Sequence, residues 1–173
     1  THTEAADMAL RGSDAVIHLA AVADVNDVVA DPVRAGRVNV LGTQAILEAA
    51  RRGGVSRVVY GSTVWVYGNS PAEGVLDEES PLALPDHLYT ATKIAGEMYA
   101  RAYNSLYGLE QTILRFGIPY GPRARPAAVV PAFVTRAARG DALTIAGDGR
   151  QTRQFVYVED LAAGIVAGLA PAA

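Results

Sequence analysis

Short apolar runs alternate with longer stretches of helical periodicity along the first two thirds of the chain. The runs Ala15–Ala20, Arg57–Gly61 and Gln111–Phe116 are too short for helices and predict strands. Between them, Pro32–Arg52 and Leu88–Tyr107 repeat their apolar residues at helical spacing. Strands that alternate with helices pair in parallel, because each helix carries the chain back to the start of the next strand. We therefore expect an α/β fold with a doubly wound parallel sheet and helices on both faces.

The character of the chain changes after Arg115, where glycine and proline cluster at 117–126. This change predicts two regions, 1–122 and 123–173. The remaining expected elements are a helix at Glu4–Leu10, a loop at Asp24–Asp27, a surface loop at Asn69–His87, a helix at Val129–Arg139, short strands at Leu143–Ile145 and Gln154–Tyr157, and a helix at Glu159–Leu169.

Composition excludes several classes of function. Half of the 173 residues are hydrophobic, 19% are charged and the net charge is −3, with acids and bases interleaved, so no basic surface points to nucleic acid. The absence of cysteine removes disulfides, thiolate catalysis and cysteine-based zinc sites. His2, His18 and His87 lack the spacing of metal ligands, so we expect no metal.

No apolar run approaches the roughly 18 residues of a membrane span, and no signal segment opens the chain, so we expect a cytoplasmic protein with no membrane partner. The chain begins at Thr1 and runs directly into a helical stretch. We expect its natural N-terminus to lie upstream.

Tyr89 and Lys93 are four residues apart on a predicted helix and therefore share one face. An ammonium beside a phenol favours the phenolate, so we expect Lys93 to lower the pKa of Tyr89 toward the range of a proton acceptor. Spacing alone more often reflects a tyrosine packed on a lysine stem. However, Lys93 is the single lysine beside fourteen arginines, and an arginine fork cannot replace a compact ammonium beside a phenol.

An ordered series of motifs surrounds this pair. It comprises Asp14–Ala21, Asn39–Thr43, Val58–Thr63, Val66–Gly68, Tyr89–Lys93, Leu114–Arg115, Tyr120–Pro122 and Gly147–Asp160. In order and spacing the series resembles the NAD-dependent epimerase/dehydratase group of the extended short-chain dehydrogenase/reductases, typified by UDP-glucose 4-epimerases. The resemblance implies a Rossmann-like fold, with a partial dinucleotide-binding domain at 1–122 and part of a substrate-binding region at 123–173.

The resemblance also implies roles for individual residues. Tyr89 would be the catalytic acid/base, Thr63 would share the substrate proton, and Lys93 would lower the pKa of Tyr89 and hold the nicotinamide ribose. Ser62 would be a further cofactor contact. The cofactor would be NAD, with NADP also open.

Five further residues, at three sites, each allow two interpretations. Leu19, Ala20 and Ala21 would approach the cofactor closely at the end of a strand, or simply pack there. Asn39 would order a loop beside the cofactor ribose, or tie its helix to a neighbouring loop. Arg153 would bind a substrate phosphate, or form a surface ion pair with an acid at 159–160.

The chain departs from the family pattern at its start. The glycine-rich turn that cradles the dinucleotide pyrophosphate is absent, as is the residue that selects NAD or NADP, and relatives carry both upstream of the stretch that begins here. We interpret this as truncation and expect these 173 residues alone to be inactive and to bind NAD weakly.

Two departures concern the reaction. Relatives commonly carry asparagine three residues after the arginine that matches Arg115, and this chain has Ile118, which cannot donate that hydrogen bond to a nucleotide. In the 4,6-dehydratase branch an aspartate and a glutamate follow the position of Thr63, and this chain has Val64 and Trp65, which cannot move a proton. Dehydration by that route is therefore disfavoured.

We expect an NAD(P)-dependent nucleotide-sugar epimerase that oxidises C4 transiently. The alternatives are a sugar or alcohol dehydrogenase/reductase with the same apparatus, and a dinucleotide-binding sensor without turnover. Relatives often dimerise through the helix that holds the catalytic tyrosine and its neighbour, so a homodimer through Pro32–Arg52 and Leu88–Tyr107 is a further expectation.

Overall fold

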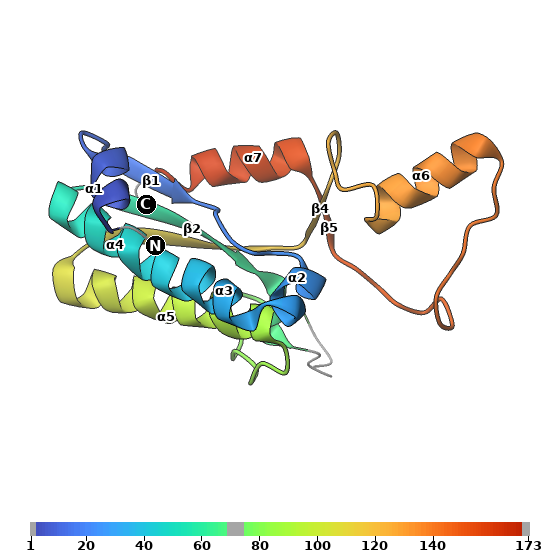
Figure 1. Ribbon diagram of the computed structural model, residues 1–173, viewed down its shortest axis with the longest axis horizontal. Coiled ribbons are helices and arrows are strands. Elements are labelled where there is room, and N and C mark those ends of the chain that lie inside the picture. The colour runs from blue at the N-terminus through green and yellow to red at the C-terminus, as the bar shows by residue number, and fades with distance from the viewer. Residues whose placement is uncertain (1–2, 69–74, 171–173) are drawn as a thin grey trace. The chain divides into compact units, whose positions relative to one another are not determined.

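The computed structural model describes residues 3–68 and 75–170. The chain forms two compact units (Figure 1). One comprises the described residues of Thr1–Arg115 and Gly168–Ala173, and the other is Phe116–Ala167. The two units are separated by how densely the chain packs within each of them. The predicted functional boundary at residue 122 stays a prediction.

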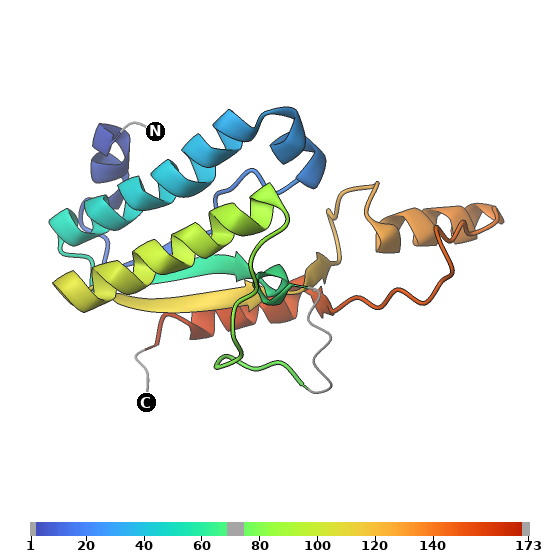
Figure 2. The same cartoon turned by 90° about the horizontal axis from the view of Figure 1, so that it is seen from below.

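The first unit is built on a three-stranded sheet of order β1-β2-β3. The strands are β1 (Ala15–His18), β2 (Arg57–Thr63) and β3 (Glu110–Phe116). β1 and β2 are parallel, with Ala15 opposite Arg57 and His18 opposite Tyr60, and Figure 2 shows β3 running in the direction of β2. All seven residues of β2 are buried, as expected for a central strand. The three predicted strands are therefore present, and β2 continues two residues further, to Thr63.

The predicted helix at Pro32–Arg52 forms as one continuous helical path with an irregular middle. It consists of α3 (Pro32–Gly36), the π-helical η1 (Arg37–Leu41) and α4 (Gly42–Gly53). Asp31 caps its start by accepting a hydrogen bond from the Arg34 N–H at 2.9 Å. The preceding segment was expected to be a loop, and this expectation is wrong: it contains the short helix α2 (Val25–Ala30), capped by Asp24. Asp24, one of the polar residues that predict a loop, acts here as the N-cap of α2, and Asn26 and Asp27 lie inside the helix.

α5 (Leu88–Tyr107) has the predicted bounds. His87 caps its start, and Gly108 ends it at φ 67°, a left-handed conformation that favours glycine. Figure 2 shows α4 and α5 side by side on one face of the sheet. The core between these helices and the sheet contains Val16, Leu47, Ala50, Val55, Val58, Ala100 and Leu109. The same unit begins with α1 (Thr3–Leu10), which packs on α4.

The second unit contains a two-stranded parallel ladder of β4 (Ile118–Tyr120) and β5 (Phe155–Tyr157). Its helices are α6 (Val129–Arg139) and α7 (Val158–Ala167). The predicted strand at Leu143–Ile145 is wrong, because this segment is irregular and both apolar side chains are exposed. The partner of β5 is instead the segment that directly follows β3.

No helix in the described part of the chain is both long enough and apolar enough to span a membrane.

Candidate active site

Lys93 lies in the second turn of α5, with its ammonium buried against the end of β2. Its Nζ donates a hydrogen bond to the Gly61 carbonyl at 2.7 Å and lies 5.1 Å from the centroid of the Tyr60 ring. Burial lowers the pKa of Lys93 to about 8. Gly61 is the one hydrogen-bond acceptor that the described residues offer to Nζ, so two of its three N–H groups remain available to a ligand.

Tyr89 lies one turn before Lys93, at the start of α5. Its backbone N–H donates to Nδ1 of His87 at 3.1 Å, and its ring packs edge-to-face on Trp65 at a centroid distance of 6.0 Å. Burial raises the pKa of the Tyr89 hydroxyl, so the expectation that Lys93 lowers it is wrong for this arrangement. The ammonium is bonded to Gly61 and lies 5.9 Å from the Tyr89 ring centroid, where its attraction is smaller than the effect of desolvation.

Thr63 is the last residue of β2 and is buried. Its Oγ1 accepts a hydrogen bond from the Trp65 N–H at 3.3 Å and so caps the short 3-10 helix η2 (Val64–Tyr67). Because the Trp65 ring contacts Tyr89, this turn brings the Thr63 and Tyr89 segments to the same end of the sheet. The Trp65 side chain is 42% exposed beside Tyr89, and no sequence signal indicated its place there except its nearness to Thr63.

Leu19, Ala20 and Ala21 follow β1 directly. Since His18 pairs with Tyr60, these residues leave the sheet at the edge where β2 carries Gly61. Leu19 and Ala20 are exposed and Ala21 is half-buried, so this edge is lined by accessible small and aliphatic side chains. Their contact with a cofactor stays a prediction.

Asn39 lies in the π-helical segment η1 and is fully buried. Its Oδ1 accepts from the Val22 N–H at 2.7 Å, and its Nδ2 donates to the Val22 carbonyl and to Thr92 Oγ1, both at 3.0 Å. Thr92 Oγ1 in turn donates to the Tyr89 carbonyl at 2.7 Å. Asn39 therefore ties the loop after β1 to the first turn of α5. The place of this loop beside a cofactor ribose stays a prediction.

Ser62 is buried and donates its hydroxyl hydrogen to the Glu97 carboxylate at 2.5 Å. Glu97 is fully buried and also accepts from Nε and Nη2 of Arg115, at 3.1 and 2.8 Å. The Ser62 side chain is thus engaged within the protein, and its predicted role as a cofactor contact stays a prediction. Sequence reasoning missed Glu97, although it extends the spacing of Tyr89 and Lys93 by one further turn.

A second buried polar group that the sequence did not reveal lies between β1 and the helices. His18 Nε2 is 2.9 Å from Thr43 Oγ1, and the His18 ring packs on Tyr60 with centroids 5.8 Å apart. Burial, with a smaller contribution from the Lys93 ammonium, lowers the pKa of His18 to about 4. His18 is therefore neutral at physiological pH and adds no charge beside Lys93.

A comparison with family models finds one match that spans almost the whole chain. The model of the NAD dependent epimerase/dehydratase family matches residues 1–172. The chain belongs to this family.

Individual members of the NAD-dependent epimerase/dehydratase family are similar to the chain at the level of sequence. A dTDP-glucose 4,6-dehydratase of Streptomyces niveus is 38% identical over 154 residues, covering 89% of this chain and 45% of that protein. A UDP-glucose 4-epimerase of Mycolicibacterium smegmatis is 39% identical over 163 residues, covering 92% of this chain and 51% of that protein. The chain thus spans about half the length of these relatives.

A solved member of the epimerase/dehydratase family matches the fold. The UDP-glucose 4-epimerase of Thermus thermophilus, in complex with NAD, superposes with a TM-score of 0.86 at 36% identity. The superposition covers 98% of this chain and 58% of that protein. The likeness confirms the predicted Rossmann-like α/β fold.

Arg153 lies in the second compact unit, whereas Thr63, Tyr89 and Lys93 lie in the first. Its guanidinium is exposed and donates from Nη1 to the Thr152 carbonyl at 2.8 Å. Among the described residues no ion pair joins it to Glu159 or Asp160. Its role toward a substrate phosphate stays a prediction.

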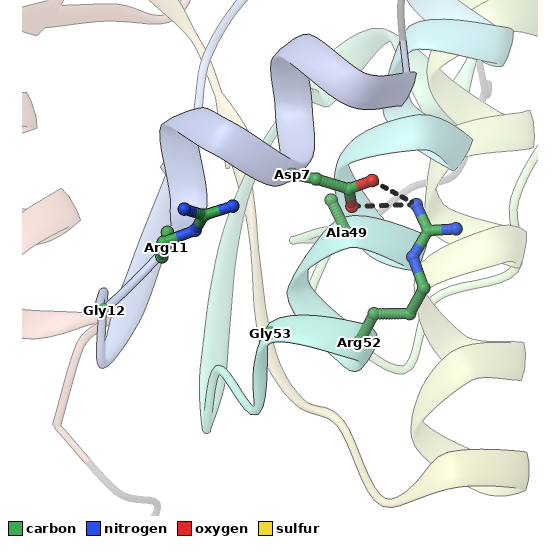
Figure 3. Close-up of a pocket in the computed structure, with 6 residues that line it drawn as sticks. All are labelled: Asp7, Arg11, Gly12, Ala49, Arg52 and Gly53. Carbon is green, nitrogen blue, oxygen red and sulfur yellow. Dashed lines mark hydrogen bonds and ion pairs between the residues drawn. The ribbon is translucent and has the colours of Figure 1, made fainter.

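A hollow of about 280 Å³ lies apart from these residues, between α1 and α4. It is lined by Asp7, Arg11, Gly12, Ala49, Arg52 and Gly53. Figure 3 shows the Asp7 carboxylate facing the Arg52 guanidinium, with hydrogen bonds of 2.8 and 2.9 Å. These bonds join the two helices, and the hollow contains none of the predicted site residues. Within residues 3–68 and 75–170, no three histidine or acidic side chains gather as a metal site would require.

Proposed function

We propose that the chain is the catalytic part of an NAD-dependent nucleotide-sugar 4-epimerase in which Tyr89 is the acid/base. The observation that carries the proposal is the placement of Tyr89, Lys93 and Thr63 at one end of the sheet, in a chain that matches the family over residues 1–172. The ligands named for the relatives, dTDP-glucose and UDP-glucose, support a nucleotide sugar as substrate.

The residues present fit a dinucleotide. Two N–H groups of Lys93 are free for ribose hydroxyls, and the exposed Leu19 and Ala20 border the same edge of the sheet. The ligand would lie at the carboxyl ends of parallel strands, where open α/β sheets bind nucleotides. NAD, when bound there, supplies the hydride acceptor and donor.

The protein residues would handle the proton. Tyr89, as phenolate, takes the proton of the sugar C4 hydroxyl while the C4–H bond breaks, and Thr63 shares that proton through its hydroxyl. Tyr89 returns the proton after the C4 ketone has turned over and is reduced on its other face. Burial disfavours the phenolate, and the Lys93 ammonium, 5.9 Å from the centroid of the Tyr89 ring, offsets only part of this cost.

The residues after Thr63 separate epimerisation from dehydration. Val64 and Trp65 carry no group that can remove or donate a proton, so the elimination step of a 4,6-dehydratase has no acid/base pair at these positions. This favours epimerisation although a dehydratase is among the similar proteins.

A reductase or dehydrogenase of the same family is the second candidate, and Ile118 favours it. Ile118 opens β4, and its aliphatic side chain cannot donate a hydrogen bond to a nucleotide base. A substrate without a nucleotide would tolerate this residue.

The test is turnover by the full-length protein with NAD and either UDP-glucose or dTDP-glucose, followed by NMR of the products and by NADH absorbance. An epimerase inverts C4 without net NADH, a dehydrogenase accumulates NADH, and a dehydratase forms a 4-keto-6-deoxy sugar. We expect C4 inversion, and we expect Tyr89→Phe to reduce it roughly 10²- to 10⁴-fold.

Tyr107→Phe is the matched control, because Tyr107 lies at the far end of the same helix and is 54% exposed. It should leave turnover unchanged. The proposal would be overturned if no cofactor and sugar gave either product or NADH and if Tyr89→Phe did not change ligand binding. That outcome would favour a sensor.

We further propose that the protein is a cytoplasmic homodimer. Large apolar side chains are exposed on the helices that the family uses for pairing, including Val33, Leu41, Met98 and Leu106, which are 45 to 72% exposed. Light scattering of the full-length protein and of a Met98→Lys variant tests this, and a wild-type protein that is monomeric at micromolar concentration would contradict it.

A further inference from the structure

Two consecutive residues of β2 are bonded to two consecutive turns of α5. Lys93 Nζ donates to the Gly61 carbonyl at 2.7 Å, and one turn later the Glu97 carboxylate accepts from the Ser62 hydroxyl at 2.5 Å. The next residue of the strand is Thr63. These two bonds fix how far along α5 the end of β2 lies, and therefore where Thr63 lies relative to Tyr89.

Arg115, the last residue of the first compact unit before the chain enters the second, holds the second of these bonds in place. Its Nε and Nη2 bind the Glu97 carboxylate in a two-pronged ion pair, which is the strongest geometry available to a guanidinium. Its Nη1 donates to the Tyr67 hydroxyl at 2.6 Å, and that hydroxyl donates to the Asp77 carbonyl at 2.8 Å. Thr63 is thus flanked on both sides by groups that Arg115 anchors, through Ser62 before it and Tyr67 after it.

The ion pair between Arg115 and Glu97 also neutralises a charge that is buried close to Lys93 in the sequence of α5. Glu97 is fully buried and lies one helical turn after Lys93, a spacing at which oppositely charged side chains attract each other. A buried carboxylate without a partner is strongly unfavourable, so without Arg115 the Glu97 carboxylate would attract the Lys93 ammonium one helical turn away. An ammonium drawn to Glu97 would leave Gly61 and Tyr89.

The other groups around Lys93 cannot take the place of Arg115. From β1 it faces His18, which burial keeps neutral, and from β2 it faces Tyr60, whose pKa burial raises. On α5 itself its ammonium lies near the Tyr89 ring, and Glu97 follows it by one helical turn. Arg115 on β3 is therefore the cation that balances Glu97 in this part of the described structure.

We infer that Arg115 is a positioning residue of the active site, which holds Glu97 on Ser62 and away from Lys93, so that Lys93 serves Tyr89 and Thr63 keeps its place. The inference rests on the proposed role of Tyr89 as acid/base. A buried ion pair by itself is weak evidence for stability. The Arg115–Glu97 pair would instead serve to keep the active-site residues in place.

The test is the ionisation of Tyr89 in the full-length protein, measured as phenolate absorbance against pH and isolated by subtracting the Tyr89→Phe curve in each background. Arg115→Met leaves the Glu97 charge unbalanced, so the pKa of Tyr89 should rise by about one pH unit. Glu97→Gln keeps an acceptor for Ser62 but leaves Arg115 unbalanced, so the pKa of Tyr89 should fall by about as much. The double variant should return close to the wild-type value.

The matched control is Arg57→Met. Arg57 forms an ion pair with Glu110, which joins β2 to β3 at the end of these strands opposite to Ser62 and Arg115. This variant should lower the melting temperature and leave the Tyr89 titration unchanged. Arg115→Lys keeps the charge without the two-pronged geometry and should shift the pKa less than Arg115→Met, so the inference stays testable if the methionine variant does not fold.

Opposite shifts for Arg115→Met and Glu97→Gln support the inference. Equal titration curves in all folded variants, or shifts in the same direction, would overturn it and leave the pair with a purely structural role. The titration does not require turnover. A wild-type protein that lacks epimerase activity but shows the opposite shifts contradicts the proposed reaction without contradicting the arrangement.

Discussion

The two compact units differ in how tightly their side chains are packed. In the first unit β2 is buried along all seven residues, and side chains such as Leu47 and Val59 are almost inaccessible to solvent. In the second unit, Phe116–Ala167, Ile165 is the one buried residue, and its paired strands are three residues each. The proposed proton chemistry lies in the first unit and the proposed phosphate contact in the second. Dense packing suits a site that must hold a few groups at fixed distances, and open packing suits a region that adapts to a ligand.

The largest effect expected inside the packed unit is on turnover. Lys93→Arg should lower turnover by roughly 10²-fold or more, because a guanidinium cannot occupy the compact position of the ammonium between Gly61 and Tyr89. Circular dichroism should show an unchanged fold. The same exchange in reverse at the exposed Arg101 of α5, Arg101→Lys, is the control and should be silent. If Lys93→Arg retained activity, the proposal that the proton chemistry depends on the packed first unit would be contradicted.

The next prediction compares the two units in stability. Leu47→Ala removes an almost fully buried side chain and should lower the free energy of unfolding by about 2 to 5 kcal/mol. Val166→Ala, in α7 and 63% exposed, should change it by less than about 0.5 kcal/mol. Urea unfolding of each variant measures both values. Similar losses at the two positions would contradict the contrast in packing.

Acid should destabilise the first unit through His18. Its pKa is lowered from 6.5 to about 4 in the folded state, so the unfolded chain binds a proton that the folded chain does not bind over this interval. Stability is therefore fully present above pH 6.5 and falls as the pH drops toward 4, by about 3 kcal/mol in total.

The measurement is the free energy of unfolding from pH 7 to pH 4. His18→Gln should remove most of this slope, whereas His87→Asn, which keeps a capping side chain at the start of α5, should retain it. A wild-type slope that survives in His18→Gln would show that another group carries the acid sensitivity.

The smallest expected effect concerns helix glycines. A Cβ at Gly96 of α5 would lie 2.1 Å from the Tyr60 hydroxyl, so Gly96→Ala must push the helix or the ring aside and should cost about 1 to 3 kcal/mol. A Cβ at Gly164 of α7 would meet no atom within 4 Å, and Gly164→Ala should be neutral or stabilise by up to about 1 kcal/mol. Thermal unfolding of the two variants measures the effect of the same Gly→Ala substitution in each of the two units. A Gly96→Ala variant as stable as the wild type would show that α5 and the Tyr60 ring can move apart at little cost in free energy.

Sequence reasoning succeeded where the signal is local. The end of α5 follows from Gly108, and the shared face of Tyr89 and Lys93 follows from their spacing. It failed where a side chain must choose among distant partners. Spacing could not show that Lys93 bonds to Gly61 rather than to Tyr89, and the desolvation that raises the pKa of Tyr89 depends on the packed sheet.

Long-range pairing explains the other failures. Glu97 and Arg115 lie 18 residues apart on different elements, and only the sheet brings them together. The apolar segment Leu143–Ile145 satisfies the local criteria for a strand, but β5 pairs with Ile118–Tyr120 instead. Of the residues that predict a loop before α3, Asp24 caps α2 and the others lie inside it. This outcome depends on the apolar contact of Val28 with Val22 and Ala35.

The π-helical segment that holds Asn39 has a consequence for changes of chain length. A π turn contains one residue more than the α-helix it interrupts, and such turns are typically found at functional sites. Each helical residue turns the chain by about 100°, so deleting one residue within Arg37–Leu41 would restore a regular helix and rotate Asn39 away from Val22. The helical backbone itself could continue as a regular α-helix after such a deletion. What prevents shortening here is the bond between Asn39 and the loop after β1, so this segment should tolerate substitution on its outer face far better than the loss of a single residue.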